Sequence, residues 1–252
     1  MENWLNIKFA SSRNKLYSLF LLAFLPLCCI GQSYFNRLYT NESTGSQFLS
    51  LCAQDNLGNF MVAAMANDSS THTQGIRISR MDSAGSILAS SFFNIPDYPV
   101  RKIFLSQGAL SRINNNCFAL CGVVSKSACC QYGFIVLADS NGKVYQYKDL
   151  TIAFSPTYDS FMWVAQAKYD GTNLLVLSHY STFKGAMKQV LTKLDTALNI
   201  LWSKAYELGS YPTNAGFDLL ADSTGYVVCG MSNNRLNDYK AFRTESMVYR
   251  TD

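Results

Sequence analysis

A chain of 252 residues with 48% hydrophobic residues can bury a sizeable core, which excludes an intrinsically disordered protein. Charged residues make up only 15% of the chain and aromatic residues 13%, a balance that favours β-structure. The formal net charge of +4 includes Lys8, Arg13 and Lys15, which an N-terminal leader would remove, so no basic footprint for nucleic acid remains.

The first 31 residues have the order of a secretory signal peptide. Three basic residues precede an apolar run from Leu16 to Ile30, and a small residue, Gly31, follows it. The run is short, contains Pro26 and has no strong positive charge after it, which argues against a transmembrane anchor.

We therefore expect residues 1–31 to be a cleaved signal peptide and residues 32–252 to be the exported domain. After cleavage no transmembrane segment remains. Lipid attachment at Cys28 or Cys29 is an alternative, but the bulky Leu27 before Cys28 argues against it because a small residue is expected there.

Two turn markers recur along the exported part of the chain. The first is an aspartate after an apolar stretch, and its four copies are 57, 56 and 57 residues apart. In two of these copies a glycine follows three residues after the aspartate. The second marker lies between these turns and repeats independently at a similar period. The first marker consists of Asp82 with Gly85, Asp139 with Gly142, Asp195 and Asp252. The second consists of Asp55 with Gly58, Asn114 to Asn116, Asp170 with Gly171, and Asp222 with Gly225.

These residue types predict hairpin bends. Asp and Asn side chains accept hydrogen bonds from the backbone two residues further on, and Gly tolerates the positive φ of tight turns. Runs of strand length, apolar or alternating, lie between the bends. In chain order the predicted strands are 34–39, 48–53, 59–65, 76–81, 86–93, 102–105, 117–124, 133–138, 143–147, 161–167, 173–178, 189–194, 200–206, 217–221, 226–231 and 246–250.

Sixteen short strands without helical periodicity predict an all-β propeller of four-stranded antiparallel blades, in four repeats of about 56 residues. A β-sandwich is the runner-up, but it gives no reason for the period. The repeat units are 34–82, 86–139, 143–195 and 199–252. Because 34–39 matches the last strand of a blade, the chain either closes a four-bladed ring with that strand or belongs to a larger propeller.

Six cysteines follow the leader, an even number that permits disulfides in an oxidising compartment. Buried thiols in strands are the simplest interpretation. The second is a hairpin disulfide between Cys121 and either Cys129 or Cys130. A metal site comes third, because the cluster lacks the paired C-x2-C spacing of structural zinc sites.

The repeat resembles a known group of proteins. Asp55-Asn-Leu-Gly-Asn-Phe-Met-Val-Ala-Ala64 is similar to the D-x-x-G-N repeats of secreted bacterial β-propellers, and Leu194 to Tyr206 resembles a strand pair common in exported proteins of the Bacteroidetes. The resemblance implies a propeller fold and export. In this pattern Leu198 stands where glycine is expected.

Catalytic motifs are absent from the sequence, and no catalytic, cofactor or metal-binding residue is predicted. The two histidines, His72 and His179, are expected in solvated loops, without a neighbouring ligand or nucleophile motif. The acids outside the turns, such as Asp97, Asp149 and Asp159, are not paired by any motif.

The sequence therefore predicts a protein that is not an enzyme: an exported binding or scaffold module, secreted or at the cell surface, with an unknown protein or glycan as partner. One alternative is a carbohydrate-active propeller whose acids converge near the central axis. Another is a structural spacer within a longer adhesin-like chain.

Overall fold

The computed structural model describes ten segments of the chain, all of them between residues 51 and 251. The chain divides into two compact units, Met1–Leu38 and Tyr39–Asp252, and every described residue belongs to the second. The expected signal peptide, the expected strand 34–39 and the last turn residue, Asp252, lie outside the described residues. The described segments are 51–67, 73–96, 102–106, 108–127, 130–150, 160–182, 188–206, 213–222, 225–235 and 242–251.

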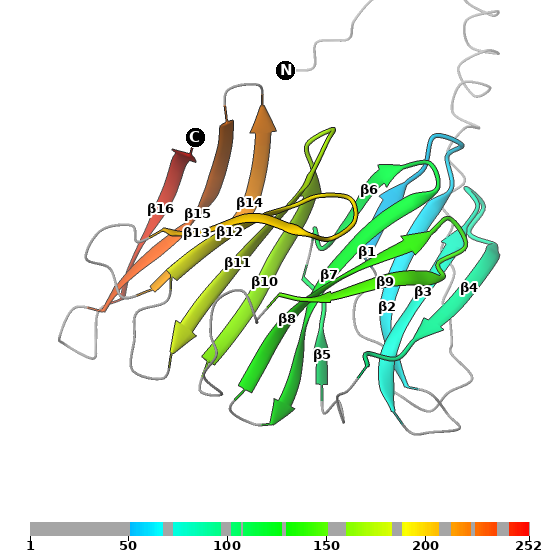
Figure 1. Cartoon of the computed structure of the whole chain (residues 1–252), viewed down its shortest axis with the longest axis horizontal. Helices are drawn as coiled ribbons and strands as arrows, with labels where there is room; N and C mark the ends of the chain where they lie inside the picture. The colour runs from blue at the N-terminus through cyan, green and yellow to red at the C-terminus, as the bar shows by residue number, and fades with distance from the viewer. Residues whose placement is uncertain are drawn as a thin grey trace, which may run out of the picture. The chain divides into compact units, whose positions relative to one another are not determined.

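The first blade is a four-stranded antiparallel meander in the order β1-β2-β3-β4 (Figure 1). Its strands β2 and β3 place alternate side chains in the core, which is the period-two pattern of a sheet that packs on a neighbour. The strands are β1 (Leu51–Gln54), β2 (Phe60–Asn67), β3 (Gln74–Met81) and β4 (Ile87–Phe93).

The second blade has the same order, but its first strand is in two pieces. Both pieces pair with β7, and the residues between them include Gly108, whose φ of +76° lies in the left-handed region. The sequence predicted only the first piece. The strands are β5 (Lys102–Phe104), β6 (Leu110–Asn114), β7 (Cys117–Ser127), β8 (Cys130–Asp139) and β9 (Val144–Asp149).

The third and fourth blades complete the described part of the fold. The third is the meander β10-β11-β12-β13, and the fourth contains β14-β15-β16. The strands of the fourth blade are longer than the sequence predicted. The bounds are β10 (Ser160–Tyr169), β11 (Leu174–Thr182), β12 (Lys188–Leu194), β13 (Ile200–Tyr206), β14 (Thr213–Asp222), β15 (Gly225–Arg235) and β16 (Phe242–Thr251).

The blades are separate sheets that pack through their faces. A single parallel residue pair, Phe161 with Gln131, joins the second and third blades, so their nine strands form two blades and not one continuous sheet. One apolar cluster, including Ile78, Phe134 and Val164, unites the first three blades. A smaller cluster packs the third blade on the fourth through Leu177 and Leu219. This arrangement of packed four-stranded sheets is that of a β-propeller.

The first strands of successive blades also contact one another. Arg112 of β6 donates to the Gln54 carbonyl of β1 at 3.1 Å, and the Ala167 amide of β10 donates to the Gly108 carbonyl at 3.4 Å. Because the blades of a propeller surround a central channel, strands that meet in this way are the innermost ones. A polar side chain on these strands therefore lies where propellers can hold ligands.

Candidate functional site

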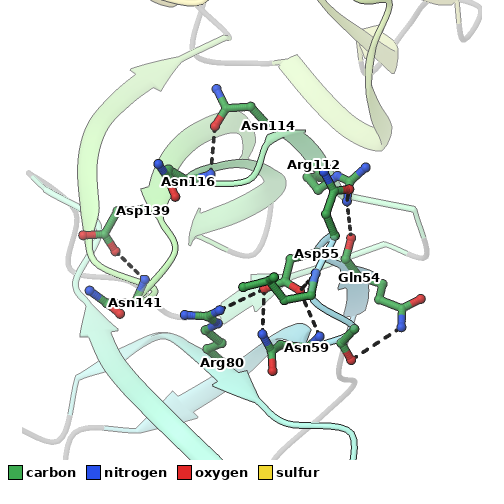
Figure 2. Close-up of polar contacts among 12 residues, drawn as sticks. Gln54, Asp55, Asn59, Arg80, Arg112, Asn114, Asn116, Asp139 and Asn141 are labelled. Carbon is green, nitrogen blue, oxygen red and sulfur yellow. Dashed lines mark hydrogen bonds and ion pairs between the residues drawn. The ribbon is translucent and has the colours of Figure 1, made fainter.

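The predicted hairpin bends are tight turns organised by their aspartates, as the close-up of the first and second blades illustrates (Figure 2). Asp55 Oδ1 accepts the amides of Leu57 and Asn59 at 2.8 and 2.9 Å. Its Oδ2 accepts Asn59 Nδ2 at 3.0 Å and Arg80 Nη2 at 3.0 Å. Both oxygens of this buried carboxylate are therefore satisfied within the turn and by the neighbouring strand.

The other described turns repeat this pattern. Asp139 and Asp195 each accept two amides, from the residues two and four positions further on, and Asp170 accepts those two and three positions further on. Asp82 accepts the Ser86 amide at 2.7 Å. The side chain of Asp222 is outside the described part of the structure. These carboxylates hold the turns together.

The glycines of these turns have positive φ, where a side chain causes strain. The values are +80° for Gly58, Gly85 and Gly142, +98° for Gly171 and +139° for Gly225. Leu198, which replaces the expected glycine, also has a positive φ, +57°. Its side chain is 2% exposed and belongs to the core cluster of the first three blades, so burial compensates for an unfavourable backbone.

Hydrogen bonds and an ion pair change the pKa values of the turn carboxylates. Burial works against ionisation of Asp55, but its bonds from Asn59, Leu57 and Arg80 together hold its pKa below the ordinary value. Asn199 bonds Asp195 in its turn in the same way as Asn59 bonds Asp55. These bonds lower the pKa of Asp195, which is exposed. These shifts arise from turn geometry and do not mark a catalytic acid.

The inner strands of the third and fourth blades carry a different kind of carboxylate. Asp218 of β14 is exposed and accepts a hydrogen bond on Oδ1 from Gln166 Nε2 of β10, at 2.9 Å. The amide of Leu219 donates to the same oxygen at 2.8 Å. Both of these bonds reach Oδ1, and none of the described residues donates to Oδ2.

Backbone irregularities place this pair at the contact between blades. The pairing register shifts between Val164 and Gln166 on β10, and between Gly216 and Asp218 on β14, so both residues follow a β-bulge. Bulges redirect side chains and are frequent next to active sites. Nearby, Lys168 Nζ donates to the Leu219 carbonyl at 2.9 Å, which joins the same two strands.

Sequence reasoning missed Asp218, although the repeat contained a signal for it. Asp218 lies four residues before the turn residue Asp222, and the equivalent positions in the other repeats are Leu51, Leu110 and Gln166. Two repeats therefore have leucine there, while the third and fourth have a polar residue and an acid. A comparison of the repeats position by position would have identified this departure.

The two histidines are not part of this pair. His179 lies within β11 and is 5% exposed, whereas the sequence placed it in a solvated loop. The prediction was wrong because β11 extends to Thr182, and Ser178 and His179 continue its ladder against β10 and β12. His72 lies outside the described residues.

The predicted disulfide can be compared with the register of the β7–β8 hairpin. Cys121 carries a free, buried thiol opposite Ile135, and burial raises its pKa. Cys130 pairs with Ser127, five residues further along the ladder, which corresponds to about 17 Å. A disulfide needs Cα atoms within about 7 Å, so this register is incompatible with a Cys121–Cys130 bond. Cys129 lies outside the described residues.

The described segments lack two features that many metal-binding and membrane-spanning proteins have. Within them, no three His, Cys, Asp or Glu side chains come together as a metal site would require. The same residues include no helix with the length and apolar character needed to cross a bilayer.

Comparison with known proteins gives one informative result. No family model matches the chain, and no curated protein matches it in sequence. Among solved structures, it is similar to an α-L-arabinanase from Penicillium chrysogenum complexed with arabinobiose, with a TM-score of 0.54 and 10% identity. The match covers 81% of this chain, and the chain spans only 62% of the arabinanase.

This similarity confirms the all-β propeller of four-stranded antiparallel blades that the sequence predicted. It contradicts the expected function, a non-catalytic binding or scaffold module, because the matched propeller is an enzyme that acts on a glycan. The finding instead favours the alternative, a carbohydrate-active propeller. Local motifs could not have pointed to that alternative, because glycoside hydrolysis needs only carboxylates that the fold brings together.

Proposed function

We propose that this protein is a carbohydrate-active propeller that hydrolyses glycosidic bonds, with Asp218 as a residue that contacts the substrate. The observation that carries the proposal is the exposed Asp218 carboxylate on an innermost strand, hydrogen-bonded to Gln166 of the next blade. The similarity to an arabinanase supports the choice of glycan as substrate class.

The geometry of Asp218 suits one of the two carboxyl groups of such a reaction. Glycoside hydrolases use one carboxyl group as an acid and another as a base or nucleophile. Asp218 Oδ1 is held by two donors, which fixes the orientation of the group. The other oxygen is then available to accept a proton from water or to attack the anomeric carbon.

We also propose that the protein is exported, secreted or held at the cell surface, as the N-terminal order of charges and apolar residues indicates. An extracellular glycan is then the accessible substrate. The resemblance to exported Bacteroidetes propellers supports the same location, and lipid attachment at Cys28 or Cys29 stays the less favoured route to the surface. N-terminal sequencing of the exported protein, together with its distribution between medium and membrane, tests this part.

The test of the enzymatic function is a hydrolysis screen with a matched pair of variants. The purified protein is incubated with linear arabinan and with arabino-, xylo-, galacto- and gluco-oligosaccharides, and released reducing ends are measured. We expect cleavage of at least one of these glycans, and a loss of about 10³-fold in kcat/KM for Asp218→Asn, because a catalytic carboxyl group contributes on that order.

The control variant is Asp195→Asn, which changes an exposed turn aspartate and leaves the inner strands intact. It should retain the wild-type kcat/KM. Wild-type protein that cleaves none of these glycans would contradict the proposed function, and so would full activity in Asp218→Asn.

A further inference from the structure

Gln166 holds an unusual position in the contact between the third and fourth blades. Its Nε2 donates to Asp218 at 2.9 Å, while its Oε1 is buried and has no hydrogen-bond partner among the described residues. A buried acceptor without a partner carries a free-energy cost. Such a cost requires an explanation, and a catalytic role is one of the recognised ones.

The second blade provides the space that Gln166 occupies. Gly108 has a φ of +76°, and a Cβ on it would lie 3.1 Å from Gln166 Nε2 and 3.3 Å from its Cγ. The carbonyl of Gly108 also accepts the amide of Ala167 at 3.4 Å. Glycine at 108 therefore permits both the local backbone and the close approach of the glutamine.

We propose that Gln166 is the positioning residue of Asp218, and that Gly108 provides the space that Gln166 needs. The proposal rests on the proposed function, because positioning matters for rate only if Asp218 contacts substrate. Gly108 of the second blade thus makes room for Gln166 of the third blade, and Gln166 orients the Asp218 carboxylate of the fourth blade.

The orientation of the Gln166 side-chain amide explains why its loss should lower the reaction rate. With Nε2 toward Asp218, the glutamine donates to the carboxylate, which is its fixed acceptor. Together with the Leu219 amide, it restricts rotation of the carboxyl group, which keeps the second oxygen in one place. A displacement of about 1 Å at such a group can cost about 100-fold in rate.

The experiment compares Gln166→Met with Gln146→Met. Both glutamines bond a neighbouring blade, but Gln146 donates to the Ala197 carbonyl from the outer strand β9. Methionine keeps the length of the side chain and removes the donor. For each variant we would measure kcat and KM on the cleaved glycan, the melting temperature, and the side-chain conformation of Asp218 in a crystal structure.

We expect Gln166→Met to lower kcat about 10- to 100-fold with KM within about threefold, and to leave Asp218 in more than one rotamer. Gln146→Met should change only the melting temperature. Gly108→Ala should reproduce the Gln166→Met result, because the added methyl displaces the amide, and Gln166→Glu should be worse because it places a second carboxyl group beside Asp218.

A single, unchanged Asp218 rotamer in Gln166→Met would overturn the proposal, as would an unchanged kcat in that variant. If the wild-type protein cleaves no glycan, the proposed function fails, and the rotamer of Asp218 still decides whether Gln166 positions it.

Discussion

Asp55 and Asp218 are two aspartates of one fold with opposite environments. Asp55 is buried in a turn and has donors on both oxygens, one of them the Arg80 guanidinium at 3.0 Å. Asp218 is exposed on an inner strand, and its hydrogen bonds from the described residues reach one oxygen only. The comparison separates the repeated aspartates, which build the scaffold, from an aspartate outside the repeat pattern, which is the residue that we propose contacts the substrate.

The largest effect on stability is expected where a turn also touches the next blade. A Cβ at Gly142 would lie 2.5 Å from the Ile78 carbonyl oxygen of the first blade, at a φ of +80°. We expect Gly142→Ala to lower the free energy of unfolding by about 2–4 kcal/mol, from backbone strain and steric overlap together. Chemical denaturation measures this change.

Gly171→Ala is the matched control, because its φ is +98° but nothing lies within 4 Å of a Cβ there. It should cost only the strain, about 1 kcal/mol. Equal losses in the two variants would show that the contact between blades adds nothing at Gly142.

Asp55→Asn should be the next largest change. An NH2 group in place of Oδ2 is a donor and can accept neither from Asn59 Nδ2 nor from Arg80, so we expect a loss of about 2–3 kcal/mol. Because the pKa of Asp55 is lowered in the folded state, its contribution is complete above the unfolded value of about 3.9. It is lost as the pH falls from there through the folded value.

Denaturation of wild type and Asp55→Asn as a function of pH checks this sign. The stability difference should be constant above about pH 5 and shrink in more acidic solution. A difference that grows on acidification would contradict the assignment. The exposed Asp195, in the same kind of turn but without a cation, should give a smaller decrease in melting temperature when replaced by asparagine.

The smallest expected effect is at Leu198, where the smaller of two replacements should give the more stable variant. Both Leu198→Gly and Leu198→Ala remove a buried side chain, but glycine also relieves the positive φ of +57°. We therefore expect the glycine variant to be about 1 kcal/mol more stable than the alanine variant. Calorimetry of the two proteins measures the difference, and a more stable alanine variant would show that the backbone at 198 is unstrained.

The sequence predicted the strands and turns because both depend on local chemistry. Aspartates and glycines at a regular spacing define the bends, and alternating apolar residues such as those of β2 define the strands between them. The division of the inner strand of the second blade depended on one φ angle at Gly108, which no composition pattern indicates.

The candidate site could not be predicted in the same way, because it depends on contacts between blades. Gln166 and Asp218 are 52 residues apart, and no motif links them. Only the register and the packing of the third blade on the fourth bring them within 2.9 Å. The burial of His179 likewise depended on how far β11 extends, which a polar Ser-His sequence did not indicate.

The most direct test of the account measures Asp218→Asn and Asp55→Asn side by side, in the glycan hydrolysis assay and in thermal unfolding. The account predicts opposite results: Asp218→Asn loses about 10³-fold in kcat/KM with little change in melting temperature, and Asp55→Asn loses stability but keeps its kcat/KM below the melting transition. An Asp218→Asn protein that unfolds earlier while retaining full activity would contradict the central claim.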